Sequence, residues 1–180
     1  MISGPSGAGK GTLVTRVRER RSNLGLTVSA TTRAPRKGEV DGVNYFFLTR
    51  EEFDRRVANG EFVEWAEVHG NCYGTLVSEV QSKLASGSSL ILEIDVQGAL
   101  QVKERFPEAV LIFIKPTSLA VLRERLVGRG TETPETIELR MANAAHELAL
   151  ADRYDDVVVN DDLDRATDEL VRVLDMHERI

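Results

Sequence analysis

A glycine-rich segment close to the N-terminus restricts the fold of this chain more than any other feature; it reads Gly4-Pro5-Ser6-Gly7-Ala8-Gly9-Lys10-Gly11-Thr12. Glycines at both ends allow a tight turn in which several backbone N–H groups point into one concavity. A helix after the turn adds its positive N-terminal end, and Lys10 adds a mobile positive charge. The spacing G-x-x-x-x-G-K is typical of a phosphate-binding loop. The segment therefore predicts a site for the phosphates of a nucleotide.

Two details of the segment depart from the usual pattern. Gly11 stands where Ser or Thr is usual and Thr12 comes one place later, so a hydroxyl ligand for Mg²⁺ is not predicted at that position. Only residues 1–3 precede the loop, although such a loop normally follows a buried strand of about five residues. We therefore expect either a chain that begins downstream of its natural start or a shortened central strand.

Strand and helix patterns alternate along the rest of the chain. The continuous apolar runs at 89–95 and 110–114 have the composition of buried parallel strands. This alternation predicts an α/β fold, a parallel sheet flanked by helices, with an α+β insertion at 33–68. Further strands are expected at 26–28, 43–48, 61–68 and 157–159, with a turn at 71–74. Helices are expected after the glycine-rich loop and at 49–59, 76–84, 96–106, 119–126, 134–151 and 163–177.

Composition limits the class of protein. A chain of 180 residues that is 42% hydrophobic is expected to form one domain around one core. No apolar run approaches the roughly 18 residues of a membrane span, and no signal peptide opens the sequence, so we expect a soluble protein. A single cysteine, Cys72, excludes an internal disulfide and fits the cytoplasm; we interpret it as a packing residue rather than a nucleophile.

The charge distribution favours a small anionic ligand. The net charge is −6, which disfavours binding to nucleic acid, since such proteins normally present a basic face. The basic residues of interest form short clusters, Arg33/Arg36/Lys37 and Arg123/Arg125/Arg129. Local arginine clusters in an acidic protein suit a compact phosphate group better than a long polyanion.

Seven segments, in order along the chain, resemble the guanylate kinase family; they read GPSGAGKGT, SATTRAPR, VNYFF, GEFVEWAEVHGNCYGT, LILEIDVQGA, RLVGRGTETPETIELR and VVVNDD. The resemblance implies a P-loop NTPase-like fold and ATP-dependent phosphorylation of GMP, and of dGMP, to the diphosphate, with Mg²⁺ as cofactor. It further implies a core at 1–30, 88–125 and 150–180, a GMP-binding region at 31–87 and a helical lid at about 126–149. The expected partners are these small molecules, with no nucleic acid and no membrane, and the oligomeric state is open.

The resemblance also implies which residues bind GMP; they are Ser29, Arg33, Arg36, Tyr45, Glu64, Tyr73, Thr75 and Glu93. Arginine guanidinium groups form paired hydrogen bonds to phosphate, and tyrosine hydroxyls complete such a cage. A carboxylate accepts from two adjacent donors of guanine, the ring N–H and the exocyclic amino group, whereas adenine offers an acceptor at the ring position. Alternation in 61–68 predicts that Phe62, Glu64, Ala66 and Val68 share one face of a strand.

A second set of residues matches positions that the family uses for ATP and for catalysis. Arg129 and Arg140 match the arginines of the lid and core, and they join Lys10 and Arg36 as expected catalytic residues. Asn160 matches a position beside the adenine of ATP. Asp95 is a candidate for the metal region through a water molecule, and its alternative role is that of a helix N-cap.

The sequence leaves two alternatives to an active GMP kinase. One is a non-catalytic guanylate-kinase-like module that binds phosphopeptides; the intact phosphate loop disfavours it. The other is a kinase for a different nucleoside monophosphate or a phosphorylated sugar, which the combination of Glu64, Tyr73 and Thr75 disfavours. Arg123 and Arg125 are interpreted as charges on the surface of a helix.

Overall fold

The computed structural model describes residues 1–85, 87, 89–128 and 133–178. The chain divides into two compact units, which are described separately. Unit 1 combines Met1–Ser22 with Glu108–Ile180, and unit 2 is Asn23–Pro107. This division differs from the expected segments, because residues 23–30 and 88–107 belong to unit 2 with the proposed GMP-binding region. The physical reason is strand pairing, since β2 (Leu24–Leu26) pairs in parallel with β7 (Ser89–Ile91).

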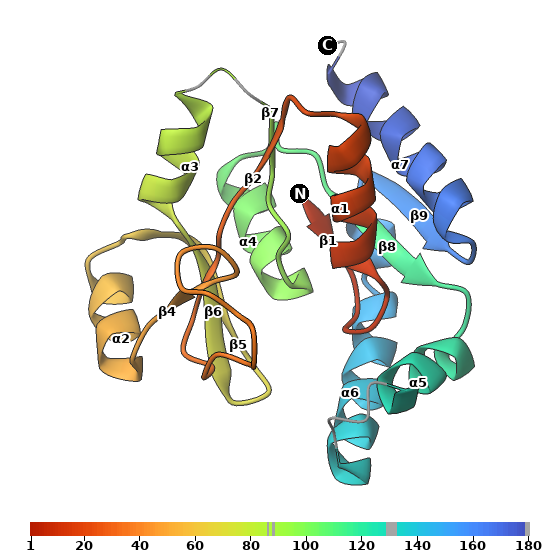
Figure 1. Cartoon of the computed structure of the whole chain (residues 1–180), viewed down its shortest axis with the longest axis horizontal. Coiled ribbons are helices and arrows are strands. Elements are labelled where there is room, and N and C mark those ends of the chain that lie inside the picture. The colour runs from red at the N-terminus through yellow and green to blue at the C-terminus, as the bar shows by residue number, and fades with distance from the viewer. Residues whose placement is uncertain (86, 88, 129–132, 179–180) are drawn as a thin grey trace. The chain divides into compact units, whose positions relative to one another are not determined.

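Unit 1 contains a three-stranded parallel sheet in the order β1 (Ile2–Ser3), β8 (Ile112–Pro116) and β9 (Asp156–Asn160) (Figure 1). The strand β1 is short but fully buried, and its register aligns Ile2 with Ile112. Phe113 and Ile114 of β8 are buried at the centre of this sheet. The parallel sheet confirms the α/β class predicted from the sequence.

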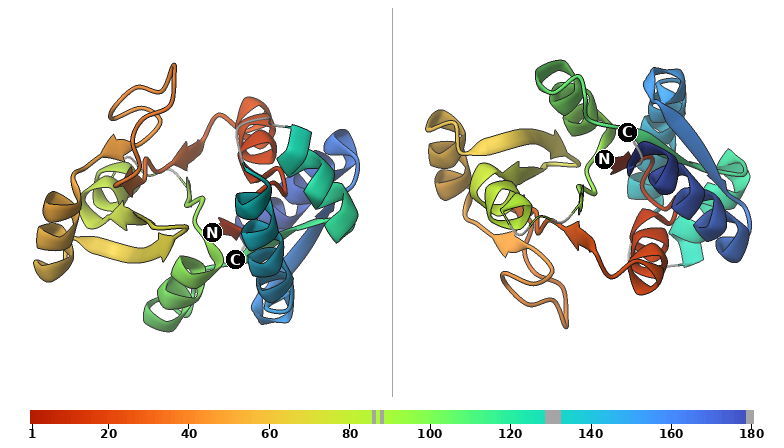
Figure 2. Two further views of the ribbon diagram at one scale, coloured as in Figure 1. Left: turned by 90° about the horizontal axis from the view of Figure 1, so that it is seen from below. Right: turned by 90° about the horizontal axis from the view of Figure 1, so that it is seen from above.

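Four helices of unit 1 pack around or beside this sheet; they are α1 (Lys10–Arg20), α5 (Leu119–Gly128), α6 (Pro134–Leu148) and α7 (Leu163–Glu178). The helix α7 packs against α1 and β9, as the right-hand view of Figure 2 shows. The helices α5 and α6 pack together through apolar residues; these are Leu122, Leu126, Ile137, Met141 and Ala144. A short 3₁₀ turn (Ala151–Arg153) leads into β9.

The start of α6 follows from its capping residues. Thr133 has an extended backbone, and its hydroxyl accepts a hydrogen bond from the Thr136 N–H at 3.3 Å. Pro134 occupies the first turn, where a missing N–H costs nothing. The sequence prediction of this N-terminus is confirmed, and the helix ends at Leu148, earlier than the expected residue 151.

Unit 2 contains a four-stranded mixed sheet in the order β4 (Phe46–Phe47), β3 (Ala30–Thr31), β6 (Asn71–Leu76) and β5 (Phe62–Val68). Its helices are α2 (Arg50–Ala58), α3 (Val77–Leu84) and α4 (Val96–Arg105). The core under α2 contains five buried residues; they are Ala30, Phe53, Phe62, Cys72 and Leu76. Cys72 is fully buried and unbridged, in agreement with its predicted packing role.

Residues 71–74 were expected to form a turn, and this expectation is wrong, because they lie in β6. The chain reverses instead at His69 and Gly70, which both have positive φ (52° and 78°). Glycine occupies strand position 74 because its neighbours leave no room for a side chain. A Cβ there would lie 2.7 Å from Cδ1 of Phe62.

The expected face of Phe62 also needs correction. The pairing of β5 with β6 shifts between Phe62, which lies opposite Leu76, and Glu64, which lies opposite Thr75. Cross-strand partners share a face, and neighbouring residues of a strand do not. This β-bulge therefore places Phe62 on the face that packs against α2, and Glu64 on the opposite face.

Other boundaries shift by a few residues. The strand expected at 26–28 lies at Leu24–Leu26, and the strands expected at 43–48 and 89–95 shorten to Phe46–Phe47 and Ser89–Ile91. Within the described ranges, the structure contains no helix with the length and apolar character that crossing a membrane requires.

Candidate active site

The glycine-rich loop of unit 1 adopts a conformation that few residues other than glycine tolerate. Gly4, Gly7 and Gly9 have φ values of 142°, 89° and 90°. The Ala8 N–H donates to the Pro5 carbonyl at 3.1 Å, which closes a tight turn. A Cβ on Gly4 would lie 2.2 Å from the Ile114 carbonyl oxygen of the neighbouring strand. The loop therefore depends on close approach of its backbone to the sheet.

The helix α1 begins directly after this loop and has no side-chain cap. Its N-cap residue is Gly9, in the left-handed conformation, which has no side chain to accept hydrogen bonds from the first-turn N–H groups. Such N–H groups, together with the positive end of the helix, bind phosphate oxygens. Leu13, Val14 and Val17 are buried and hold the helix against the rest of unit 1. Burial of these residues fixes the direction of the anion-binding end.

Lys10 lies over the loop rather than away from it. Its Nζ donates to the carbonyl oxygens of Gly4 at 2.6 Å and Pro5 at 3.1 Å. An ammonium group has three donors and a flexible stem, so it can move from carbonyl oxygens to a phosphate. The structure thus places the Lys10 ammonium against the backbone of the glycine-rich loop.

Three further polar side chains of unit 1 contact the same loop. Nη1 of Arg140 donates to Oγ of Ser6 at 2.7 Å, and Nδ2 of Asn160 donates to the Ala8 carbonyl at 2.7 Å. Arg125, interpreted from sequence as a surface charge, also donates to the Ala8 carbonyl, at 3.3 Å. That interpretation is wrong, because Arg125 is half-buried beside Leu126. Arg129 lies outside the described residues.

A second cluster, in unit 2, is built around Arg33. Its two Nη atoms donate to both carboxylate oxygens of Glu39, at 3.1 and 2.9 Å. The guanidinium carbon lies 5.3 Å from the ring centre of Tyr45, and the Tyr45 ring meets the Tyr73 ring edge-on at 6.1 Å. The structure therefore brings together three of the residues expected to hold a phosphate. Glu39, which the sequence reasoning missed, orients the guanidinium.

The electrostatic surroundings of Tyr45 connect this cluster to Glu93. Burial raises the pKa of the Tyr45 hydroxyl, and the charges of Tyr73 and Glu93 raise it further, while Arg33 opposes them. The Tyr45 hydroxyl is thus kept protonated and able to donate a hydrogen bond to an anion. Glu93 itself is half-buried just beyond β7.

Glu64 is the most deeply buried carboxylate of the predicted site. It is 4% exposed, and its Oε1 accepts a hydrogen bond from the Thr75 hydroxyl at 2.7 Å. Burial is the main cause that raises the pKa of Glu64 to about 7. The hydrogen bond from Thr75 acts to lower this pKa, and the negative charge of Asp95 acts to raise it. Tyr73 lies on the same face of β6 as Thr75, because the two residues are two apart in one strand.

Gly98 and Asp95 complete the surroundings of Glu64. A Cβ on Gly98 would lie 2.2 Å from Oε2 of Glu64, so glycine is needed where α4 passes the carboxylate. Asp95 is the N-cap of α4, and its carboxylate accepts from the N–H groups of Gln97 and Gly98 at 3.3 and 3.0 Å. The N-cap role anticipated for Asp95 is confirmed.

The remaining predicted residues of unit 2 lie at the margins of these clusters. The carbonyl oxygen of Ser29 accepts from the Phe46 N–H at 2.9 Å, which ties it to β4. Arg36 is exposed, and its backbone N–H donates to Glu39 at 2.7 Å. Arg36 therefore belongs to the same turn as Arg33, with its side chain directed to solvent.

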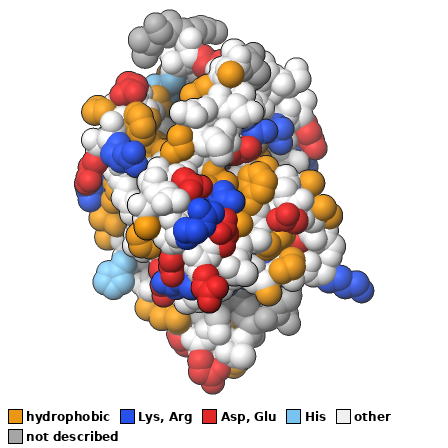
Figure 3. Space-filling view, turned by 90° about the vertical axis from the view of Figure 1, so that its left-hand side faces the viewer, with side chains coloured by type: hydrophobic (Ala, Val, Ile, Leu, Met, Phe, Trp, Pro, Cys, Tyr) orange, Lys and Arg blue, Asp and Glu red, His pale blue; other side chains and the backbone are white. Residues whose placement is uncertain are grey.

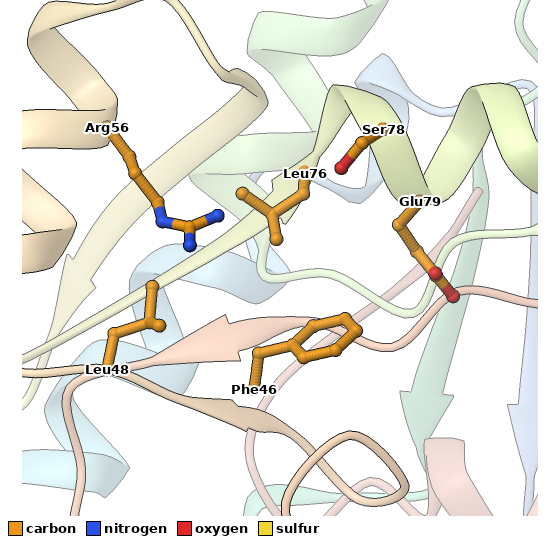
Figure 4. A pocket seen from close by; sticks show the side chains of 6 residues that line it. All are labelled: Phe46, Leu48, Arg56, Leu76, Ser78 and Glu79. Carbon is orange, nitrogen blue, oxygen red and sulfur yellow. The ribbon is translucent and has the colours of Figure 1, made fainter.

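A cavity of about 270 Å³ lies elsewhere in unit 2, and none of the residues expected to bind GMP lines it; the lining is Phe46, Leu48, Arg56, Leu76, Ser78 and Glu79 (Figure 4). The guanidinium of Arg56 pairs with Glu52, and Glu79 accepts from the Val28 N–H at 3.0 Å and pairs with Lys83. The charged groups of Arg56 and Glu79 in this cavity are thus already engaged. On the face in Figure 3, basic and acidic side chains likewise stand side by side.

The fold and the glycine-rich loop define a phosphate-loop α/β protein, and the comparisons with known proteins identify its family. The family model described as "Guanylate kinase" matches residues 1–177. The guanylate kinase of Halalkalibacterium halodurans is 53% identical over 174 residues, which cover 97% of this chain and 85% of that protein. The guanylate kinase of Gloeobacter violaceus is 55% identical with the same coverage.

A solved structure agrees with these relatives. The crystal structure of guanylate kinase from Anaplasma phagocytophilum matches with a TM-score of 0.80 and 37% identity, covering 97% of this chain and 82% of that chain. This chain therefore belongs to the guanylate kinase family.

Two contacting residues escaped the sequence reasoning for different reasons. Glu39 follows Arg36 by three residues, a spacing that suits a turn, and this spacing was a usable signal. Arg125 comes one residue before the buried Leu126 and three after the buried Leu122, which places it at the edge of the packed face of α5. Arg123 is one residue after Leu122 and three before Leu126, so helical spacing does not distinguish the two arginines, although Arg123 is exposed and Arg125 is half-buried.

Proposed function

We propose that this member of the guanylate kinase family transfers the terminal phosphoryl group of ATP to the phosphate of GMP or dGMP, giving ADP and GDP or dGDP. The choice of GMP as acceptor rests on the buried carboxylate of Glu64. It lies on the same face of the sheet as the hydroxyl-bearing side chains of Thr75 and Tyr73. Guanine presents two adjacent donors to such a carboxylate, whereas adenine presents a lone pair.

We assign the triphosphate of ATP to the glycine-rich loop. The uncapped N–H groups of α1 and the ammonium of Lys10 supply the positive potential. Arg140, which already contacts Ser6, supplies a guanidinium to the phosphates. On sequence grounds, we propose Arg129 as an arginine of the lid.

We assign the phosphate of GMP to the cluster around Arg33. The Arg33 guanidinium is held by Glu39 beside the rings of Tyr45 and Tyr73, and we propose that it binds the phosphate together with the two tyrosine hydroxyls. The exposed guanidinium of Arg36 is the mobile member of this set and the one proposed to assist catalysis. Ser29 and Glu93 are proposed as further contacts to GMP.

Mg²⁺ is proposed to arrive with ATP. Among the described residues no group of three or more His, Cys, Asp or Glu side chains is arranged to hold a metal ion, and Gly11 has no hydroxyl. Mg²⁺ commonly keeps waters and binds through substrate phosphates with few protein ligands, so this donor set fits an ion carried by ATP. When bound, the ion neutralises charge on the phosphates. The proposed role of Asp95 toward it is through water.

The chemistry requires charge neutralisation and positioning rather than a protein base. The bond between the γ-phosphorus of ATP and its bridging oxygen breaks, and a bond forms from an oxygen of the GMP phosphate to that phosphorus. Since the acceptor oxygen is already ionised, no proton has to be removed. Lys10, Arg140 and the GMP-phosphate arginines stabilise the negative charge of the transferred group. A small-molecule kinase of this kind is proposed to act in the cytoplasm.

The test is a coupled assay of ADP release with ATP and GMP, AMP, CMP or UMP as acceptor. We expect turnover with GMP far above that with the other acceptors. Replacement of Glu64 by Ala should reduce this preference by about one to two orders of magnitude, the value of a paired base contact. Glu67→Ala changes an exposed carboxylate on the same strand and serves as the control. An unchanged preference in Glu64→Ala would refute the assignment.

A further inference from the structure

The carbonyl group of Ala8, in the middle of the glycine-rich loop, is held by two side chains from distant parts of unit 1. Nδ2 of Asn160, at the end of β9, donates to it at 2.7 Å, and Nη1 of Arg125, in α5, donates at 3.3 Å. Nη2 of Arg125 also donates to the Asn160 carbonyl at 3.1 Å. Loop, strand and helix are therefore joined at one point by three hydrogen bonds.

Holding this carbonyl sets the direction of the next N–H group. In a planar trans peptide the C=O of one residue and the N–H of the next point in opposite directions. Fixing the Ala8 oxygen toward Asn160 and Arg125 therefore turns the Gly9 N–H to the opposite side of the peptide. Gly9 is the N-cap of α1, so the orientation of this peptide controls the first donor of the anion-binding end.

The contact is built into the packing of unit 1. Asn160 is 5% exposed and Ala8 is fully buried, so their hydrogen bond is shielded from water. A Cβ on Gly9 would lie 2.3 Å from Nδ2 of Asn160 and 3.9 Å from Nη1 of Arg125. The absence of a side chain at Gly9 thus gives the Asn160 amide access to the loop, while the Arg125 guanidinium lies at ordinary contact distance. A buried amide in this position is costly to remove, because it leaves the carbonyl without its partner.

We propose that Arg125 and Asn160 are positioning residues of the phosphate loop, which act through the Ala8 carbonyl on the binding of the triphosphate. The inference rests on the proposed function of the loop as the ATP site. It differs from the sequence-based assignment of Asn160 to the adenine base, since here one N–H of the Asn160 side-chain amide is donated to the loop. The two roles predict different responses to a ligand that has no base.

The experiment measures the dissociation constants of ATP, inorganic tripolyphosphate and GMP for the full chain by isothermal titration calorimetry. Asn160→Asp keeps the size of the side chain but removes the donor to Ala8, and Arg125→Gln removes the bridging guanidinium. We expect both variants to weaken the binding of ATP and of tripolyphosphate by the same factor. This factor should be about tenfold, which corresponds to the loss of one buried hydrogen bond. The affinity for GMP should stay unchanged.

Two further variants separate positioning from general effects. Arg123→Gln removes an exposed arginine of the same helix, which pairs with Glu138, and should leave all three constants unchanged. Arg125→Lys keeps a single donor nitrogen and should restore part of the lost affinity for ATP and tripolyphosphate. In steady-state assays Arg125→Gln should raise the KM for ATP and leave the KM for GMP as it is. Should Asn160→Asp fail to fold, the variants Arg125→Gln and Arg125→Lys still provide the test.

Several results would overturn the proposal. Loss of ATP affinity with tripolyphosphate unaffected would assign Asn160 to the base. Unchanged affinities, an equal loss in Arg123→Gln, or an equal loss for GMP would each show that the contact does not position the loop. A wild-type protein that binds tripolyphosphate but does not phosphorylate GMP would contradict the proposed function and leave this test intact.

Discussion

Replacement of Glu64 by Gln tests the buried carboxylate through its ionisation. Burial raises the pKa of Glu64 from its ordinary 4.5 to about 7. One unit of pKa difference is worth about 1.36 kcal/mol, so the ionised carboxylate costs the folded state roughly 3 kcal/mol. Gln fits the same space and does not ionise, so the variant avoids this cost above pH 7.

The sign of the pH dependence follows from which state binds the proton. Between pH 4.5 and about 7 the folded protein keeps Glu64 protonated, whereas the unfolded chain has lost the proton. The contribution of Glu64 to the free energy of unfolding is therefore greatest below pH 4.5 and falls as pH rises to about 7. Relative to the wild type, Glu64→Gln should become more stable across this window, by up to roughly 3 kcal/mol.

Urea unfolding of both proteins, without nucleotide, at pH 5, 6, 7 and 8 measures this difference. Glu67→Gln changes an exposed carboxylate of the same strand and is the matched control. Parallel stability curves for wild type and Glu64→Gln would refute the reasoning. Binding should show the complementary effect, since guanine requires the ionised carboxylate. The affinity of the wild type for GMP should fall about tenfold per pH unit below pH 7.

Three further substitutions probe separate parts of the account. Lys10→Ala should lower kcat in the coupled assay by about a hundredfold or more, because the ammonium stabilises charge that develops in the transition state; a decrease below threefold would contradict this role. Gly98→Ala places a Cβ 2.2 Å from Oε2 of Glu64, so calorimetry should show GMP binding weakened about tenfold while ATP binding is retained; unchanged GMP affinity would argue against the position of Glu64. Phe53→Ala removes a fully buried ring that stacks on Phe62 at 4.5 Å, and urea unfolding should show a loss of about 3–5 kcal/mol; a loss under 1 kcal/mol would show that this core is not as packed as described.

The parts of the fold that sequence reasoning recovered are those governed by local signals. The glycine spacing of residues 4–9 requires the positive φ values that the structure has. Thr133 caps α6, and Thr49 caps α2 by accepting from the Glu52 N–H at 3.1 Å. Such capping depends on residues a few positions apart, so the sequence alone carries it.

The parts that sequence reasoning missed depend on contacts between distant segments. The bulge that separates the faces of Phe62 and Glu64 arises from pairing with β6, which alternation along β5 does not reveal. The role of Arg125 depends on the Ala8 carbonyl, 117 residues away in the chain. Helical spacing could place Arg125 at the edge of the packed face of α5, but not identify what it contacts.

In the candidate site, too, local sequence signals were predictable and specific contacts between side chains were not. Of the residues expected to bind GMP, Arg33, Tyr45 and Tyr73 lie together in unit 2. The pairing of Arg33 with Glu39 was not anticipated, because charge counting does not imply a carboxylate beside an arginine that is expected to bind phosphate. Their roles toward GMP remain predictions for the experiments above.

The most direct test of the central claim follows the phosphoryl group itself. The protein is incubated with ATP labelled in its γ-phosphate, GMP and Mg²⁺, and the products are separated by chromatography. The account predicts that the label appears in the β-phosphate of GDP, in amounts equal to the ADP formed. Label recovered as inorganic phosphate, or retained in ATP while GMP is bound, would contradict direct transfer between the two nucleotides.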